Sequence, residues 1–324
     1  MSFNFQPSFW ESDSFLKPYD LIIIGAGIVG LSTALFYKKE YPKARVAVLE
    51  RGFIPQGAST RNAGFACVGS ITEHLADLKK ESEENIKRRI VQRYEGLKLL
   101  KKTLGEQAIG YEPCGGYELF TSQEEFENAA SEIDRFNGWM SELVGEESVY
   151  HSAEMEGYPV IYNRLEGALH PGKMMQELVG RVNSSGVEIK WNSPVQKVAE
   201  AGTVVLENGI ELKAKKVLFA ANGFVSRLLP DLDIKPARGL VFITNEQENL
   251  PWKGTFHYDE GYIYFRNVKN RLLIGGARNL AADDEETDHF GTNETIKKHL
   301  VKFVSEVLKL PDGWQVQQEW SGIM

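Results

Sequence analysis

Residues 19–51 read YDLIIIGAGIVGLSTALFYKKEYPKARVAVLER, and this stretch decides the fold of the chain. The apolar run Leu21–Ile24 has the length and the β-branched content of a buried parallel strand. A G-x-G-x-x-G turn follows at Gly25–Gly30, then a stretch with helical periodicity, and then a second apolar strand that ends at Glu50. Strand, glycine turn, helix, second strand and terminal acid together predict a βαβ unit that binds a dinucleotide.

Each part of this unit has a predicted physical role. Gly25 makes the tight turn, Gly27 lets the backbone approach a pyrophosphate, and Gly30 lets the helix pack closely on the strand. The helix N-terminus, at Ile28 and Val29, offers free N–H groups and a positive dipole end to phosphates. The alternative interpretation is a glycine-rich turn in some other βαβ unit.

The acidic end of the second strand extends the predicted cofactor site. Glu50 follows Gly30 by twenty residues and is placed to accept hydrogen bonds from a ribose diol. Arg51 comes next, and we include it in the predicted site.

The bulk properties exclude several classes of protein. The chain has 324 residues, which is enough for two domains, and its 42% hydrophobic and 25% charged residues are ordinary for a soluble protein. A net charge of −8 argues against a nucleic-acid surface. No window of eighteen uncharged apolar residues predicts a membrane span, and the N-terminus lacks the layout of a signal peptide.

The cysteines and the acidic residues predict neither a disulfide framework nor a metal site. Two cysteines, Cys67 and Cys114, fit a reducing compartment, so we expect a cytoplasmic protein. The acids of residues 283–288 lack the regular spacing of metal ligands, so we expect a solvated loop and no metal.

A second loop, Gly57–Cys67, is dense in small residues and carries two polar side chains in its middle. Small residues allow the backbone to come close to something bulky and flat, so we expect this loop to contact the second half of the cofactor. The alternative is a plain surface loop. The predicted contact residues are Ser59, Thr60, Arg61, Asn62, Ala63 and Gly64.

The rest of the chain contains two kinds of predicted structure: mixed helices and strands before Pro236, and mainly alternating strands after it. Helices are predicted at 71–104, 124–144 and 174–182, residues 150–164 are irregular, and a hairpin-like pair of strands lies around Asn208-Gly209. A buried strand, 216–219, then leads into a small-residue turn that can approach the dinucleotide through Ala220, Ala221 and Gly223. From Pro236 onward, alternating strands at 240–244, 255–258, 262–266 and 271–275 predict an antiparallel sheet.

We therefore predict an α/β chain (α+β overall) in which a Rossmann-type domain is interrupted by a second domain on an antiparallel sheet. The expected division is 1–105 and 151–232 for the cofactor domain, 106–150 and 233–312 for the substrate domain, and 313–324 for the start of a return to the cofactor domain.

With these segments in place, the sequence resembles the FAD-dependent D-amino-acid-oxidase-like family, which includes glycine oxidase, sarcosine oxidase and γ-glutamylputrescine oxidase. The match rests on YDLIIIGAGIVGLSTAL with VAVLER, on GASTRNAG, on the block from GALHPGKMMQEL to VLFAANGF, and on EGYIYFRNVKNRLLIGG. The resemblance implies FAD held by the interrupted domain. Because neither Cys67 nor Cys114 carries a strong attachment signal, we expect this FAD to be non-covalent. The resemblance also places Glu50 on the adenosine ribose, the loop from Ser59 to Gly64 under the pyrophosphate and flavin, and Val195 against the adenine through its backbone.

Two departures from the family pattern concern the end of the chain. Many amino-acid-oxidising relatives carry an arginine, which binds the substrate carboxylate, directly after a Trp-x-Gly-aliphatic run. Here Trp320–Ile323 is followed by Met324. Relatives also continue with a glycine-rich segment that closes over the flavin, so we expect this sequence to be an incomplete version of a longer protein.

Strand alternation places Tyr262, Tyr264 and Arg266 on one face of the predicted sheet. Two phenols and a guanidinium could form a substrate wall, with Arg266 binding an anionic group and Tyr262 hydrogen-bonding the substrate. Tyr262 also matches a substrate-facing tyrosine of glycine-oxidase-like relatives. The alternative is a solvent-exposed face with ordinary strand tyrosines.

Three functions remain open from the sequence. The first is an FAD-dependent oxidase or dehydrogenase that removes hydride from a C–H bond next to nitrogen in an amine or amino acid. The second is a 2-hydroxy-acid dehydrogenase of the 2-hydroxyglutarate type, and the third is a flavin-binding protein without turnover. The expected partners are a small-molecule amine, amino acid or hydroxy acid and an electron acceptor, either oxygen or a quinone; the oligomeric state stays open.

Overall fold

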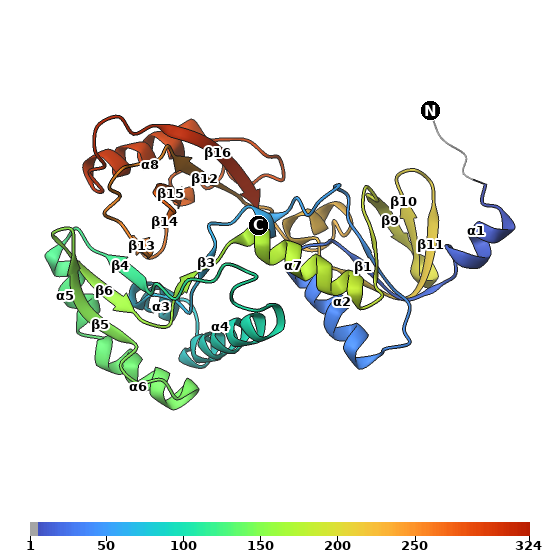
Figure 1. The fold of residues 1–324 in the computed structure, drawn as a ribbon, viewed down its shortest axis with the longest axis horizontal. Coiled ribbons are helices and arrows are strands. Elements are labelled where there is room, and N and C mark those ends of the chain that lie inside the picture. Colours follow the sequence, from blue (N-terminus) through green and yellow to red (C-terminus); the bar gives the residue numbers. More distant parts are fainter. Residues whose placement is uncertain (1–5) are drawn as a thin grey trace.

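The computed structural model describes residues 6–324 and places them in two lobes, each built on one large sheet (Figure 1). The first lobe holds a six-stranded sheet in the order β8-β2-β1-β11-β10-β9, and the second holds an eight-stranded sheet in the order β16-β12-β15-β14-β13-β4-β6-β5. The C-terminus lies between the two lobes in this view. The predicted combination of a Rossmann-type unit and a second, antiparallel sheet is confirmed.

Four strands of the first sheet, β8, β2, β1 and β11, are parallel. Strands β9 and β10, which precede β11 in the chain, extend the sheet beyond β11 in antiparallel pairs. The strands are β1 (Tyr19–Ile24), β2 (Val46–Leu49), β8 (Glu188–Lys190), β9 (Val195–Ala199), β10 (Thr203–Leu206) and β11 (Glu211–Phe219). Helices α2 (Ile28–Glu40) and α7 (Pro171–Ser184) pack together, and a short helix α1 (Phe9–Ser14) precedes the sheet.

The apolar run of β1 is buried on both of its faces, which explains why it does not alternate with polar residues. Leu21 and Ile23 belong to a core that they share with α2 and α7. Ile22 and Ile24 belong to a different core, which they share with residues of β10 and β11. The glycine turn after β1 is therefore held between two packed layers.

The second sheet is antiparallel except where β13 and β4 run parallel. Its strands are β4 (Gly116–Leu119), β5 (Tyr150–Met155), β6 (Tyr158–Asn163), β12 (Arg238–Thr244), β13 (Thr255–Tyr258), β14 (Ile263–Val268), β15 (Arg271–Gly276) and β16 (Val316–Ile323). The helices of this lobe are α3 (Ile71–Leu78), α4 (Glu83–Leu104), α5 (Gln123–Ala130), α6 (Ile133–Val144) and α8 (Glu294–Glu306).

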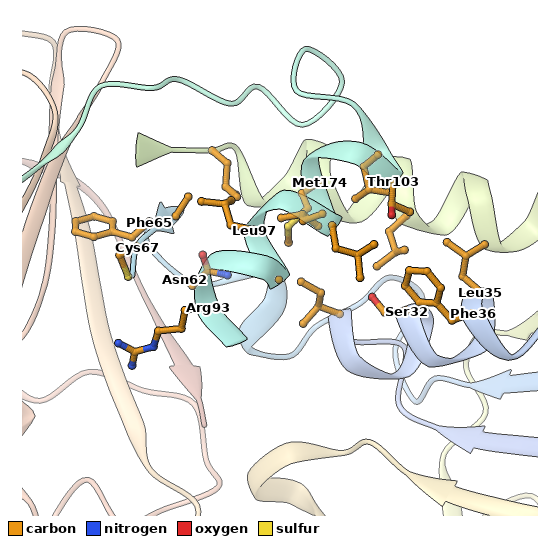
Figure 2. Close-up of a pocket in the computed structure, with 18 residues that line it drawn as sticks. Ser32, Leu35, Phe36, Asn62, Phe65, Cys67, Arg93, Leu97, Thr103 and Met174 are labelled. Carbon is orange, nitrogen blue, oxygen red and sulfur yellow. The ribbon is translucent and has the colours of Figure 1, made fainter. Parts of the chain in front are cut away.

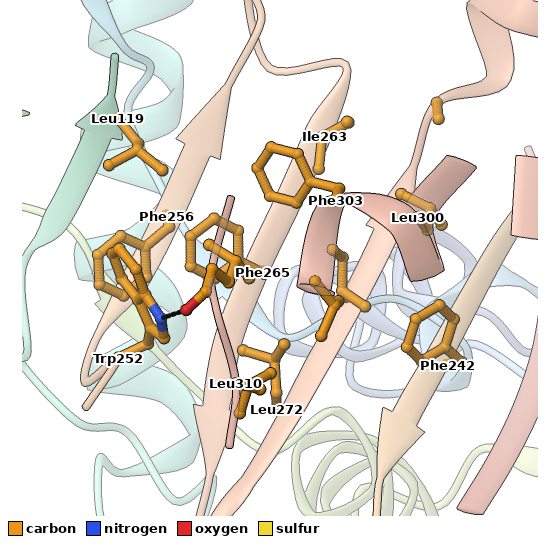
Figure 3. Packing of buried hydrophobic residues seen from close by; sticks show 14 of the residues in the cluster. Leu119, Phe242, Trp252, Phe256, Ile263, Phe265, Leu272, Leu300, Phe303 and Leu310 are labelled. Atoms are coloured by element: carbon orange, nitrogen blue, oxygen red, sulfur yellow. Dashed lines mark hydrogen bonds between the residues drawn. The ribbon is translucent and has the colours of Figure 1, made fainter. Parts of the chain in front are cut away.

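One face of the second sheet is sealed by the apolar side of α8. Phe256 and Phe265 stack at a centroid distance of 4.6 Å, and Phe303 of α8 packs beside Phe265 (Figure 3). The indole N–H of Trp252 donates to the carbonyl of Leu308 at 3.0 Å, so the only polar atom of this large side chain is satisfied. The opposite face of the sheet is therefore the one available to a site.

A small two-stranded sheet lies in the segments that connect the lobes. It pairs β3 (Phe65–Ala66), at the end of the small-residue loop, with β7 (Gly167–Ala168), which precedes α7. Because β3 belongs to that loop, the loop is anchored where the chain passes from one lobe to the other.

The structure differs from the predicted division of the chain at three places. Helix α3 and the first half of α4, within the segment 1–105 predicted for the cofactor domain, pack with the second lobe, whereas the end of α4 packs with α2 and α7. Strands β5 and β6, at 150–155 and 158–163, belong to the second sheet and not to the cofactor lobe. Four consecutive residues of the edge strand β5 are exposed, so the segment lacks the alternation that marks a half-buried strand. Strand β16 also belongs to the second sheet, where it pairs along β12 instead of returning to the first lobe.

Three local predictions are wrong in detail. The helix predicted over 71–104 is broken, because the hydroxyl of Ser82 caps a new helix by accepting from the Asn85 N–H. The helix predicted over 124–144 is divided at 131–132 into α5 and α6. The Asn208-Gly209 turn joins β10 to β11, whereas β9 and β10 are joined by a short turn at Glu200–Gly202.

Among residues 6–324, no helix combines the length and the apolar character that crossing a bilayer requires.

Candidate cofactor and substrate site

A cavity of about 630 Å³ lies at the carboxyl ends of β1, β2 and β11, where an open α/β sheet binds its ligand. The N-terminus of α2, the end of β2, the loop at 57–62 and the turn after β11 form its walls. Eleven residues of the predicted cofactor site line it: Gly25, Gly27, Ile28, Val29, Glu50, Arg51, Ser59, Asn62, Val195, Ala220 and Ala221.

Gly25 and Gly30 have the tight local geometry that their predicted roles require, and Gly27 lies between them on the cavity wall. Gly25 has φ +111°, and a Cβ there would lie 2.5 Å from the carbonyl oxygen of Ala220. A Cβ on Gly30 would lie 2.0 Å from the carbonyl oxygen of Gly25, so the start of α2 packs directly on the turn. Gly27 is the N-cap of α2 and faces the cavity.

The first turn of α2 presents its backbone N–H groups to the cavity. Gly27 has no side chain to cap the helix, and the N–H of Ile28 donates to the hydroxyl of Ser59 at 2.9 Å. Val29 is largely exposed on the cavity wall. A helix N-terminus with a hydroxyl beside it is suited to bind a phosphate.

Glu50 is fixed at the end of β2 by the backbone around it. Its side chain is only 7% exposed. Oε2 accepts from the N–H of Ala26 and Oε1 from the N–H of Gly52, each at 3.0 Å. Each carboxylate oxygen can accept a further hydrogen bond, and Glu50 lines the cavity. The carboxylate thereby has free acceptor positions on the cavity wall, as the predicted contact with a ribose diol requires.

Beyond Glu50 the cavity has an aromatic and cationic end. The guanidinium of Arg51 lies 3.7 Å from the ring centroid of Phe224, in a cation–π contact. Burial lowers the pKa of Arg51, while the charge of Glu50 acts in the opposite direction. Val195, at the start of β9, lies on the same cavity wall. This end is suited to a flat base.

The remaining predicted cofactor residues stand behind the cavity wall and hold it in shape. The hydroxyl of Thr60 donates to the carbonyl of Pro55, and Arg61 donates to the carbonyls of Gln56 and Ser321. A Cβ on Gly223 would lie 2.6 Å from the carbonyl oxygen of Met324. Gly30, Ala63 and Gly64 are likewise absent from the cavity lining.

Sequence reasoning missed the side chains that follow the small-residue turn. Phe224, Arg227 and Leu228 line the cavity, together with Glu207 from the β10–β11 turn. Arg227 in turn forms an ion pair with Asp288. Their position in the sequence could have identified three of them, because Phe224, Arg227 and Leu228 directly follow the turn at 220–223 that was predicted to approach the cofactor.

Tyr262, Tyr264 and Arg266 do not form one open wall. Tyr262 precedes β14 and is 42% exposed, and its carbonyl accepts from the N–H of Ala277 at 2.6 Å. Tyr264 is on the sheet face that meets the small-residue loop, where its ring lies edge-on to Phe65 at 5.8 Å. Burial raises the pKa of Tyr264 to about 12.

Arg266 lies on the same face but is only 5% exposed. Its Nη1 donates to the carbonyls of Gly64 and Leu169, each at 2.9 Å. The prediction that Arg266 presents a free guanidinium to a substrate is therefore wrong, because the guanidinium donates to backbone carbonyls. Neither the cofactor cavity nor a second, apolar cavity is lined by any of the three residues of the predicted wall.

That second cavity, of about 490 Å³, lies between α2, α4 and α7. Figure 2 shows Asn62, Phe65, Cys67 and Arg93 at one end and Phe36 with Leu35 at the other. Ile28 and Asn62 line both cavities, so the two share a wall at the small-residue loop.

A buried polar cluster lies next to Phe65. The Nε2 of His257, on β13, lies 2.9 Å from a carboxylate oxygen of Glu166, and His257 meets the ring of Phe65 edge-on. The other oxygen of Glu166 accepts from the N–H groups of Val68 and Gly69. Burial alone would lower the pKa of His257, but the Glu166 carboxylate and further acids raise it. Sequence analysis predicted no role for Glu166.

The cofactor cavity fits FAD by its shape and its donor set. It offers a glycine-lined helix N-terminus for the pyrophosphate, a buried carboxylate for the ribose and an aromatic end for the adenine. At Gly25 and Gly30 an added Cβ would clash with carbonyl oxygens of the chain itself, so the turn beside the cavity requires glycine for its own packing.

Known proteins have sequences related to this chain. A 27% identity over 225 residues relates the chain to an L-2-hydroxyglutarate dehydrogenase of Escherichia coli, covering 67% of this chain and 51% of that protein. A glycine oxidase of Bacillus subtilis is 22% identical over 316 residues, covering 95% of this chain and 81% of that protein. The chain spans about half the length of the first curated relatives that it matches, with shares of 51%, 51% and 44%.

Solved structures show the same fold. Glycine oxidase from Geobacillus kaustophilus superposes with a TM-score of 0.72 at 20% identity, covering 94% of this chain and 82% of that one. Iminodiacetate oxidase from Chelativorans sp. BNC1 superposes with a TM-score of 0.73 at 15% identity, with the same two coverages. A sequence profile described as "FAD dependent oxidoreductase" matches residues 20–324. Because that match covers both sheets and the whole cofactor cavity, the chain belongs to the FAD-dependent oxidoreductase family of the D-amino-acid-oxidase type.

Proposed function

We propose that the chain uses non-covalent FAD to oxidise a C–H bond next to nitrogen in an amine or amino acid. The observation that carries the proposal is the cavity at the end of the first sheet, with the α2 N-terminus, Glu50 and the turn after β11 around it. Family membership supports the cofactor, and the relatives that are named as glycine oxidase and iminodiacetate oxidase support the substrate class.

The chain would hold FAD through groups that the structure already orients. The first turn of α2 and the hydroxyl of Ser59 would bind the pyrophosphate, and Glu50 would accept the ribose hydroxyls. Arg51 and Val195 would contact the adenine side, while Asn62 would contact the flavin end, with Ala63 and Gly64 behind it supporting the loop. When bound, FAD accepts the hydride, and the protein supplies orientation and electrostatics.

On the substrate side, we propose Tyr262 and Tyr264 as hydrogen-bonding groups. Tyr264 lies on the interior strand β14 and its ring contacts Phe65, while Tyr262 directly precedes the same strand and is partly exposed. No general base is required beyond deprotonation of the substrate amine.

The first test is bleaching of the flavin absorbance in the absence of oxygen. We expect bleaching on addition of an amine or amino acid. Bleaching by 2-hydroxy acids alone would instead favour the second candidate, a 2-hydroxy-acid dehydrogenase, which the L-2-hydroxyglutarate dehydrogenase relatives support. No bleaching by either class would indicate a flavin-binding protein without turnover.

The residue at position 324 predicts a preference among amine substrates. Met324 occupies the position where many amino-acid-oxidising relatives carry a carboxylate-binding arginine. Loss of a charge-assisted pair costs roughly 1.5–3 kcal/mol, or about ten- to a hundredfold in affinity. We therefore expect larger or N-substituted amines to give a higher kcat/KM than glycine or D-alanine. Steady-state rates on a panel of both kinds test this, and glycine or D-alanine as the best substrate would contradict it.

We also propose oxygen or a quinone as the electron acceptor and a cytoplasmic location. The two cysteines of the chain, which are free thiols in the structure, are consistent with a reducing compartment. Reoxidation of the reduced protein by air or by a soluble quinone, followed by absorbance, distinguishes the two acceptors.

A further inference from the structure

Arg266 bridges three segments that are distant in the sequence. It stands on β14 of the second sheet, and its Nη1 donates to the carbonyls of Gly64 and Leu169 at 2.9 Å each. The N–H of Leu169 also donates to the carbonyl of Gly64, at 2.8 Å. Gly64 has φ +77°, and a Cβ there would lie 2.9 Å from Nη1 and 2.4 Å from the Leu169 oxygen. The backbone is thus shaped to admit the guanidinium.

The positive charge of Arg266 is buried without an acidic partner. Within residues 6–324, no aspartate or glutamate oxygen lies within ion-pair distance of its guanidinium, and Glu112 acts on it only from farther away. Arg238 on β12 of the same sheet shows the usual arrangement, since its partly buried guanidinium pairs with the buried carboxylate of Glu285 at 2.7 Å. A buried charge is costly unless a partner compensates it, and the acceptors of Arg266 are the backbone carbonyls of residues 63, 64, 169 and 267. Arg266 does not itself line the cofactor cavity, but an anionic group of a ligand bound there would interact favourably with its unpaired charge.

A short chain of contacts connects Arg266 to the wall of the cofactor cavity. Asn62 lines the cavity, and its Oδ1 accepts from the N–H of Gly64 at 2.8 Å. Gly64 is in turn held by Arg266 through its carbonyl. The position of the loop at the cavity is therefore coupled to a side chain of the second sheet.

The direction of the dinucleotide identifies which end of the cofactor meets this loop. Glu50 marks the adenosine ribose, and the α2 N-terminus marks the pyrophosphate. The part of FAD beyond the pyrophosphate then extends toward Asn62 and Gly64, away from Glu50. The redox-active ring is the part that reaches the loop held by Arg266.

We propose that Arg266 is a positioning residue for the flavin, holding the loop at Gly64 while its unpaired positive charge stabilises the negative charge that the cofactor gains on reduction. This inference rests on the proposed function, because it requires FAD in the cavity. It assigns to Arg266 two separable effects: the guanidinium geometry sets FAD affinity, and the charge sets the midpoint potential.

The test compares three variants of the FAD-loaded protein. Arg266→Gln removes the charge, Arg266→Lys keeps the charge but removes the planar set of donors, and Arg271→Gln removes the same charge from the adjacent strand β15. Arg271 is a matched control because it is partly exposed and pairs with Glu246. FAD affinity is measured by fluorescence titration of the stripped protein, and the midpoint potential by equilibration with a redox dye of known potential.

We expect Arg266→Gln to shift the oxidised-to-reduced ratio at fixed potential by at least tenfold toward the oxidised form, which is about 30 mV for a two-electron couple. Its FAD affinity should fall by tenfold or more. Arg266→Lys should lose affinity to a similar degree but change the ratio less than twofold, and Arg271→Gln should change neither quantity.

Native potential and native affinity in Arg266→Gln would overturn the proposal. If Arg266→Gln does not fold, Arg266→Lys is the deciding variant. Native FAD affinity in Arg266→Lys would overturn the role of the guanidinium geometry in affinity. A tenfold change in its oxidised-to-reduced ratio would overturn the role of the charge in the midpoint potential. Failure of the wild-type chain to bind FAD at all would overturn the proposed function instead, so the two failures are distinguishable.

Discussion

Two buried histidines show how single neighbours decide the charge of a residue. His257 lies against the carboxylate of Glu166, which raises its pKa despite burial. His74 is 1% exposed, stacks on Phe136, and has no hydrogen-bond partner for its Nε2 among the described residues. Burial lowers the pKa of His74 to about 4, with acids such as Glu73 opposing the shift. The pKa of His257 is therefore raised and that of His74 lowered, although both side chains are buried.

His74 should make the protein less stable in acid. Between about pH 6.5 and pH 4, the unfolded chain binds a proton at His74 and the folded chain does not, so this contribution to stability falls as the pH falls. Replacing it by a group that does not titrate, in His74→Gln, should reduce the loss of unfolding free energy between pH 7.5 and pH 5.0 by about 2 kcal/mol.

Urea unfolding at the two pH values measures the effect of His74→Gln. His299→Gln on α8 is the control, because His299 is exposed on the helix surface. An equal pH dependence in wild type and His74→Gln would show that His74 does not stay neutral in the folded protein.

Glu50→Gln should weaken FAD binding. A carboxylate that accepts from ribose hydroxyls loses charge-assisted bonding when it becomes an amide, on the order of 1–3 kcal/mol. The structure adds a second effect, because Glu50 also accepts from the N–H groups of Ala26 and Gly52. An amide can accept through only one of its two polar atoms, so the melting temperature of the FAD-free protein should also fall.

Fluorescence titration of FAD and a thermal melt of the stripped protein separate these two effects of Glu50→Gln. A surface change, Glu40→Gln at the end of α2, serves as the control. An unchanged FAD dissociation constant would mean that Glu50 does not face the ribose.

At the scale of elements, helix α3 shows why the predicted long helix was wrong. Its N-terminus is capped by Ser70 and also faces Glu118 of β4, which accepts from the N–H groups of Ile71 and Thr72. Burial raises the pKa of Glu118, while its hydrogen bonds to Thr72 and Ser70 oppose the shift. Helix α3 is thereby fixed to the second sheet, and α4 must start again in a new direction.

Two glycines inside helices should respond to alanine in opposite ways. In Gly30→Ala the new Cβ would lie 2.0 Å from the Gly25 oxygen, so α2 must move away from the turn that approaches the pyrophosphate. We expect FAD affinity to fall at least tenfold and stability to fall by 1–3 kcal/mol, the usual cost of overpacking, roughly estimated.

Gly96→Ala on α4 is the matched change, since its Cβ would meet nothing within 4 Å. Alanine is the better helix former by about 1 kcal/mol, so this variant should be as stable as the wild type or more stable. Thermal melts with and without FAD measure both variants. Normal FAD binding by Gly30→Ala would refute the close contact between α2 and the turn.

At the scale of the whole molecule, the chain should hold FAD without a covalent bond. Burial raises the pKa of both thiols, Cys67 and Cys114, so neither is a reactive thiolate near neutral pH. We expect a yellow protein, or one that becomes yellow on addition of FAD, and free flavin in the supernatant after denaturation. Colour that stays with the precipitated polypeptide would contradict the non-covalent assignment, and tight NAD binding without FAD binding would contradict the cofactor.

Much of the first lobe could be predicted from the sequence because its signals are local. The apolar run of β1, the glycine spacing and the acid at the end of β2 each follow from neighbours within residues 19–51. Eleven predicted cofactor residues consequently line the cavity. The edge strand β5 lacked such a signal, because its exposed residues form a strand only through pairing with β6.

The sequence by itself determined the cofactor class, the βαβ opening and the antiparallel second sheet, since turn chemistry and hydrophobic periodicity are properties of short segments. Only the tertiary structure decided the environment of Arg266. Strand alternation placed it correctly on one face with Tyr264, but the two acceptors that hold its Nη1, Gly64 and Leu169, lie 202 and 97 residues away in the chain. Whether a guanidinium is free for a substrate or committed to backbone carbonyls depends on which distant segments fold against it, and no local pattern carries that information.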